Sequence, residues 1–176
     1  MLLRLLVILL LSSLPSVLCF GQADDTPQEY LVKAKYMLNI PLFSEMPFHA
    51  MNDKSFTICL IGDTPLAGIL ASSKGKLVKN RPLTVMGVDT VAHVDSCQML
   101  FIASSERHRL QSLLPEAHRR GILTISDMRD FARLGGMIGL LTVDSRVTFD
   151  VNRSAASKAA ISFSSHLLKL AHDIIN

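Results

Sequence analysis

Two apolar runs in the middle of the chain most strongly restrict how it can fold. Phe56–Ile61 and Gln98–Ala103 are almost entirely apolar, without the alternation of a half-exposed strand. Such runs are typical of strands that are buried on both faces, as in a parallel sheet. A turn or capping sequence follows each run, Gly62-Asp63-Thr64-Pro65 or Ser104-Ser105-Glu106, and apolar residues at helical spacing come next. This order predicts a parallel sheet with helices on its faces.

The rest of the chain predicts further elements of the same kind. Periodicity predicts a helix from Pro27, strands at 83–88 and 122–125, a short helix over 127–134, and two helical pieces within 153–175. The strand patterns at 137–143 and 146–151 are joined only by Asp144-Ser145, which predicts a hairpin. We therefore expect an α/β fold: a single three-layer domain with a mixed, mostly parallel sheet flanked by helices and an antiparallel hairpin at one edge.

The first 23 residues have the layout of a signal peptide. Arg4 supplies a positive charge, Leu5–Leu11 is an unbroken apolar run, and small residues follow near Ala23. This layout predicts removal of residues 1–23, a domain over residues 24–176, and a periplasmic location. Two alternatives stay open. One is a membrane anchor, although the apolar run is short for a spanning helix, and the other is a lipoprotein acylated at Cys19.

Cysteine usage agrees with export. If Cys19 leaves with the signal peptide, Cys59 and Cys97 remain, and an even number of cysteines in an exported protein suggests a disulfide. Both lie in predicted strands, and neighbouring strands could bring them to bonding distance. The alternative is two buried free thiols that pack as small apolar side chains.

Charge and motifs argue against several classes of function. Without Arg4 the chain keeps 17 basic and 15 acidic residues, a balance too even to indicate nucleic-acid binding. No histidine pair has metal-binding spacing, and no phosphate-binding or G-x-S-x-G motif occurs. We therefore predict no enzyme activity, no metal and no cofactor. The junctions Gly62-Asp63-Thr64 and Ser104-Ser105 remain candidates for the mouth of a small-molecule pocket.

An apolar stripe near the C-terminus is the other informative pattern. Phe163, Leu167 and Leu170 recur at helical spacing, with Lys169 off the stripe. Two interpretations stay open. In one the stripe covers the sheet, and in the other part of the stripe is exposed and binds a partner or a second copy of the chain. Together with Phe149 of the 146–152 strand, these three apolar residues are the candidate partner-binding residues, and a homodimer is one form that such a contact could take.

A set of short segments follows in order along almost the whole predicted mature chain. The segments are Ala34-Lys35-Tyr36-Met37, Phe56–Asp63, Gly75-Lys76 with Asn80-Arg81-Pro82, Cys97–Ile102, Ile122–Asp127, Phe131-Ala132, Gly135–Ile138, Val147–Asn152, Ser164-Ser165 and Leu167–Ala171. In this order they resemble the YfiR family of periplasmic proteins. Cys59 and Cys97 match one disulfide pair of that family, whereas a second pair, known in some members near residues 135–142, is missing here.

The resemblance implies a regulatory function. It implies a repressor that binds the periplasmic sensor domain of an inner-membrane diguanylate cyclase and so lowers cyclic di-GMP and biofilm formation. It also implies an outer-membrane lipoprotein that can sequester the repressor. Two alternatives remain beside this interpretation, a periplasmic small-molecule binding module and an exported enzyme that uses an unpaired cysteine.

Overall fold

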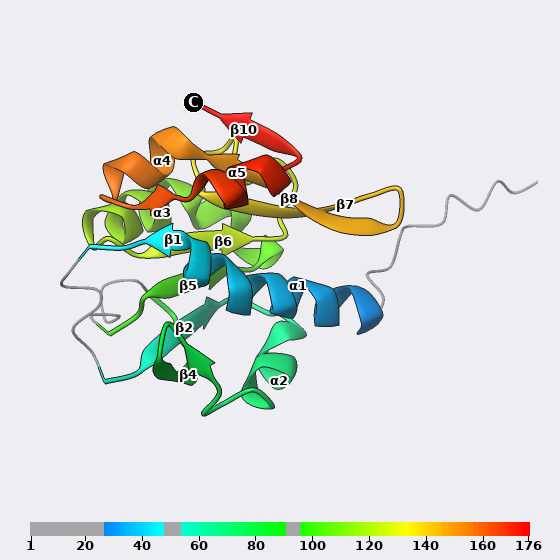
Figure 1. Ribbon diagram of the computed structural model, residues 1–176, viewed down its shortest axis with the longest axis vertical. Coiled ribbons are helices and arrows are strands. Elements are labelled where there is room, and N and C mark those ends of the chain that lie inside the picture. Colours follow the sequence, from blue (N-terminus) through cyan, green and yellow to red (C-terminus); the bar gives the residue numbers. More distant parts are fainter. Residues whose placement is uncertain (1–26, 48–53, 91–95) are drawn as a thin grey trace, which may run out of the picture.

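A large, twisted sheet forms the centre of the molecule (Figure 1). The computed structural model describes residues 27–47, 54–90 and 96–176, so the predicted signal peptide lies outside the described residues. Within these ranges the larger sheet has eight strands in the order β10-β8-β7-β6-β5-β2-β4-β3. Its strands are β2 (Phe56–Ile61), β3 (Leu77–Val78), β4 (Arg81–Gly87), β5 (Met99–Ile102), β6 (Leu123–Ser126), β7 (Ile138–Val143), β8 (Arg146–Asn152) and β10 (Asp173–Ile175).

The order of the strands is that of a doubly wound sheet. β2, β4, β5, β6 and β7 are all parallel, and the chain places β4 on one side of β2 before it crosses to β5 on the other side. This is one of the two common orders of open α/β sheets. β8 runs antiparallel to β7 as the predicted hairpin. The predicted fold class is thus confirmed. A short strand that was not predicted, β10, pairs in parallel with β8 on the outer side of the hairpin.

Helices cover both faces of the sheet. They are α1 (Pro27–Asn39), the 3-10 helix η1 (Ile40–Phe43), α2 (Leu66–Ala71), the 3-10 helix η4 (Ser104–Arg109), α3 (Leu110–Arg119), α4 (Arg153–Lys158) and α5 (Ser165–Leu170). In Figure 1, α1 and α2 lie in front of the sheet and α3 lies behind it. A separate two-stranded antiparallel sheet joins β1 (Ser44–Glu45) to β9 (Ser162–Phe163).

Successive side chains of the central strands enter two different cores. Ile58 and Leu60 pack in the larger core, to which α1, α2, α4 and α5 contribute. Cys59 and Ile61 pack in the smaller core, to which α3 contributes. All six residues of β2 and all four of β5 are buried, as the apolar runs predicted. A strand of this kind is stable only if both of its faces are covered.

The predicted disulfide lies in the smaller core. Cys59 in β2 and Cys97 just before β5 are bonded, with their Cα atoms 5.9 Å apart. Both residues are buried, and the parallel pairing of β2 with β5 brings them together. The bridge therefore joins the two neighbouring strands whose burial defines the fold.

The prediction of a helix over 127–134 is wrong. The segment forms successive turns between β6 and β7. Asp130 has a φ of 61°, a left-handed conformation that an α-helix cannot accommodate. Side chains hold the turns in place, because Ser126 Oγ accepts from Met128 N at 2.9 Å and Asn152 Nδ2 donates to Ala132 O at 2.7 Å.

Reduction of the disulfide should lower the stability of the native chain. The bridge closes a loop with a sequence separation of 38, and the chain-entropy relation then gives about 3–4 kcal/mol. We expect the urea midpoint of the oxidised protein to fall on reduction. Both sulfur atoms remain in the core, but the unfolded chain is no longer constrained by the bridge and gains conformational entropy. A Cys59→Ala, Cys97→Ala double variant controls for other effects of the reductant. An unchanged midpoint for the wild type would contradict the role assigned to the bridge.

Candidate functional site

An exposed apolar surface forms where η1 lies beside α5. The rings of Phe43 in η1 and His166 in α5 have centroids 5.3 Å apart. Ser164 N donates to Phe43 O at 2.9 Å, which continues the pairing of β1 with β9. Residues 166 and 170 are one helical turn apart, so Leu170 lies on the same face of α5 as His166. Leu42, Phe43, His166 and Leu170 define what we call the η1–α5 surface.

The apolar members of this surface are unusually exposed for side chains of their type. Leu42 is 50% exposed, Phe43 37% and Leu170 58%. Single exposed apolar residues are common, but several of them on two neighbouring elements more often mark a contact with another molecule. The η1–α5 surface is therefore the candidate site for a protein partner.

Local sequence explains why these residues come together. Pro41 lies in η1, and a proline cannot take a place in the interior of an α-helix without disrupting it. α1 therefore ends before Pro41, and the chain turns toward the small β1–β9 sheet. Lys79 Nζ donates to Pro41 O at 3.1 Å and to Ser44 O at 2.7 Å, which fixes the segment from the other side. Burial lowers the pKa of Lys79, an effect that the Glu45 carboxylate partly opposes.

Two of the four predicted partner-binding residues are in the core. Phe149 is 1% exposed and packs edge-on against Tyr36, with ring centroids 5.4 Å apart. Leu167 is 3% exposed and packs in the larger core, as the buried residue of α5. The prediction that Phe149 and Leu167 contact a partner is therefore corrected. Phe163 is half-buried in β9, and Leu170 is exposed.

Leu42 and Phe43 were not predicted as part of a site. The helical pattern of α1 stops at Pro41, and nothing in the sequence assigns the two apolar residues after it to the core or to the surface. Their place beside α5 follows from the tertiary contact between Phe43 and His166, which joins segments more than 100 residues apart in the chain. The one signal that could have found them is an apolar pair directly after a helix-ending proline.

The two junctions predicted as a pocket mouth close against each other. Asp63 N donates to Ser105 Oγ at 3.2 Å. Gly62 has a φ of +83°, and a Cβ atom there would lie 2.5 Å from Ser105 Oγ. The side chains of Ser105 and Glu106 thus fill the space between the carboxyl ends of β2 and β5, where doubly wound sheets commonly bind ligands. A hollow of about 460 Å³ lies on the other side of Gly62, toward Lys74 and Gly87, and Ser104 and Ser105 do not line it.

A buried ion cluster holds α1 against the turns that follow β6. Lys33 Nζ lies 3.0 Å from both Glu29 Oε1 and Asp127 Oδ2, and the lysine is 3% exposed. Thr142 Oγ1 donates to Glu29 Oε1 at 2.6 Å, which connects the cluster to β7. The ammonium also lies 4.6 Å from the centroid of the Tyr30 ring. These contacts make the cluster a structural link between α1 and the sheet.

The described ranges contain neither a candidate metal site nor a candidate membrane span. No group of three or more His, Cys, Asp or Glu residues in these ranges could hold a metal ion. No helix in the same ranges is long and apolar enough to cross a membrane.

The chain belongs to the YfiR/HmsC-like family, whose sequence profile matches residues 30–172. The fold also resembles solved structures. The ABC domain in complex with L-Trp from Streptococcus pneumonia matches with a TM-score of 0.55 at 7% identity over 83% of this chain. A conserved domain protein from Vibrio cholerae O1 biovar El Tor matches with a TM-score of 0.52 at 12% identity over 82% of this chain. The chain spans 60% of the length of each, and these likenesses show the fold alone. Among curated proteins, none matches the chain.

Replacement of Lys33 should destabilise the fold far more than replacement of its exposed neighbour Lys35. Lys33→Met keeps most of the side-chain volume but leaves Glu29 and Asp127 without the ammonium between them. Removing one partner of a buried ion pair typically costs about 3–5 kcal/mol. The matched control Lys35→Met, on the same helix, should stay within about 0.5 kcal/mol of the wild type in urea denaturation. Equal effects of the two substitutions would refute the structural role of the cluster.

Proposed function

We propose that this protein is a periplasmic repressor that binds the periplasmic sensor domain of an inner-membrane diguanylate cyclase. Membership of the YfiR/HmsC-like family, over residues 30–172, is the observation that carries the proposal. At the level of the family it supports a periplasmic regulator of such a cyclase. Repression would lower cyclic di-GMP and biofilm formation, and an outer-membrane lipoprotein that sequesters the repressor would reverse the effect.

The η1–α5 surface is the part of the molecule that we assign to the cyclase. Leu42, Phe43 and Leu170 already present apolar area to solvent. A partner can therefore bury this area, and the complex gains the hydrophobic free energy, without unfolding of the domain. A partner that exists in two states is shifted from mostly active to mostly inactive by about 5.5 kcal/mol of differential affinity. A few well-buried apolar and aromatic residues at the centre of an interface commonly contribute that much. Catalytic groups are not required for such a role.

A charge on the η1–α5 surface should abolish repression. Leu170→Glu places a carboxylate where the proposed interface excludes water, and we expect at least about a 30-fold loss of affinity. The mature protein, used as bait on solubilised inner membranes, should recover a diguanylate cyclase, and Leu170→Glu should not. In cells that lack the gene, expression of the wild type should lower cyclic di-GMP, whereas expression of the variant should leave it high.

Met86→Glu is the matched control for this experiment. Met86 is an exposed apolar residue of β4, which lies at the opposite end of the sheet from α5 in Figure 1. The control should bind and repress like the wild type, and all three proteins should have the same thermal midpoint. If deletion of the gene leaves cyclic di-GMP unchanged, the repressor function is wrong. If Leu170→Glu still represses, the repressor function stands and its assignment to this surface is wrong.

A further inference from the structure

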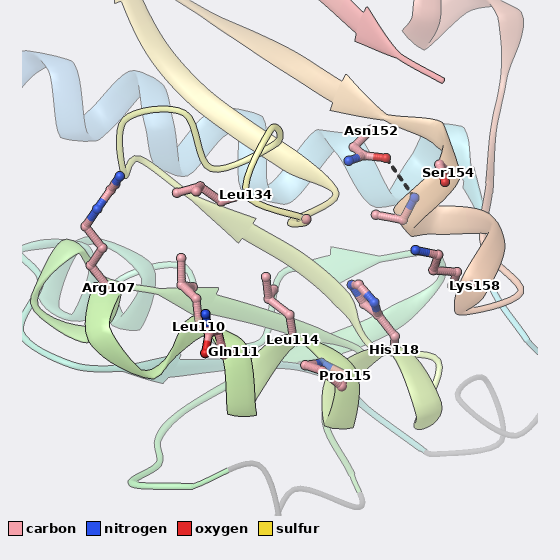
Figure 2. Close-up of a pocket in the computed structure, with 12 residues that line it drawn as sticks. Arg107, Leu110, Gln111, Leu114, Pro115, His118, Leu134, Asn152, Ser154 and Lys158 are labelled. Carbon is pink, nitrogen blue, oxygen red and sulfur yellow. Dashed lines mark hydrogen bonds between the residues drawn. The ribbon is translucent and has the colours of Figure 1, made fainter.

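A pocket of about 430 Å³ lies between α3 and α4, on the side of the molecule where the smaller core is formed (Figure 2). Leu110, Leu114 and His118 follow one another along α3 and point into it, and Leu134 faces them from the turns before β7. The first turn of α4 and the end of β8 complete the wall. The volume is within the range of pockets that hold small organic ligands.

The lining combines aliphatic side chains with positive charge. Its apolar residues are Leu110, Leu114, Pro115, Leu134 and Ala155, and the lining contains no Phe, Tyr, Trp, Asp or Glu. Arg107 and Lys158 lie at opposite ends of the pocket in Figure 2. Arg107 already donates to Arg129 O at 3.0 Å, whereas Lys158 makes no ion pair with any residue that the structure describes. A lining of this composition favours an anion and disfavours a cation.

His118 provides a polar atom without a partner at the Lys158 end. Its Nε2 is buried and makes no hydrogen bond within the described residues. Burial, together with the charge of Lys158, lowers the pKa of His118. Asn152, another polar residue of the lining, already has partners, because Oδ1 accepts from Ala155 N and Nδ2 donates to Ala132 O, each at 2.7 Å. A buried polar atom without a partner is rare in native proteins, and a bound ligand is one way to satisfy it.

We propose that this pocket binds an organic carboxylate with an aliphatic chain. The carboxylate lies between His118 Nε2 and Lys158 Nζ, and the chain extends over Leu114 and Leu110 toward Arg107. The charge of the ligand offsets that of Lys158, and its oxygen satisfies the buried imidazole nitrogen. The aliphatic wall buries the chain. This site is separate from the η1–α5 surface, so the proposal does not depend on the cyclase as partner.

Calorimetric titration of the mature, oxidised protein with octanoate tests the chemistry of the ligand. We expect saturable binding of one octanoate per chain. Three related probes separate the contributions: octanol lacks the charge, octylammonium reverses it, and acetate lacks the chain. Each should bind at least about tenfold more weakly than octanoate. Equal binding of octanol or octylammonium would overturn the anion site, and the lack of saturable octanoate binding would overturn the proposal.

Two charge-removing variants locate the site. Lys158→Gln should weaken octanoate binding about threefold to tenfold. Lys169→Gln makes the same change on an exposed lysine of α5 that does not line the pocket, and it should leave the affinity unchanged. Both lysines are exposed, so both variants should fold with the wild-type thermal midpoint. Equal loss in the two variants would show a non-specific charge effect and would overturn the assignment to this pocket.

The titration of His118 gives a readout that a merely structural residue would not. The charged groups of the lining are Lys158 of α4 and Arg107 of η4, and the turn at Leu134-Gly135 contributes no charged side chain. Glu116 on α3 is paired with Arg119 and Arg120. A bound carboxylate favours protonated His118 and raises its pKa above the lowered value of the free pocket, so affinity should increase as pH falls through the pKa of His118 in the complex. The binding enthalpy should then vary with the ionisation enthalpy of the buffer. This dependence should be lost in His118→Gln, and its persistence there would assign the proton to another group.

Discussion

Burial of β2 and β5 on both faces is the constraint on which the rest of the structure depends. Each strand offers alternate side chains to two cores, so the fold needs a helical layer on either side of the sheet. The Cys59–Cys97 bridge lies inside one of these cores and fixes the same two strands to each other. The ion cluster around Lys33 then holds the helix of the opposite layer. The covalent link thus joins two strands within the sheet, and the ionic link joins α1 of the front layer to the sheet.

The two layers are not equivalent, and the difference creates the pocket. α1, α2, α4 and α5 all contribute to the larger core, whereas α3 is the helix that contributes to the smaller one. α3 meets α4 only along part of its length, and the turns before β7 fill the remaining space incompletely. The result is an aliphatic recess with cations at its ends, next to a well-packed core. Its position follows from the geometry of the layers, and its charges come from Arg107 of η4 and Lys158 of α4.

The central strands could be predicted well from the sequence because their signal is physical and local. A continuous apolar run of this length is compatible with few structures besides a buried strand, and Phe56–Ile61 forms the predicted strand with the same boundaries. The failures occur where tertiary contacts decide. Asp130 takes a left-handed conformation that its local pattern does not indicate, and β10 is a three-residue strand that depends on β8. The same limit applies to the site: a helical stripe cannot show which of Leu167 and Leu170 faces the sheet, and it cannot bring Phe43 next to His166.

The pocket and the η1–α5 surface are connected through α4 and β9. Ala155 lines the pocket, Ala156 and Ala159 of the same segment pack in the larger core, and β9 leads from there to α5. A ligand changes the affinity for a protein partner only if it binds one of two arrangements of this connection more tightly. Any such coupling is reciprocal, so a partner bound at η1–α5 would change the affinity of the pocket for its ligand by the same factor. Ile161 N donates to Ala156 O at 2.9 Å, so a backbone hydrogen bond joins α4 to the residue that precedes β9, and a shift of α4 would reach β9 through this contact.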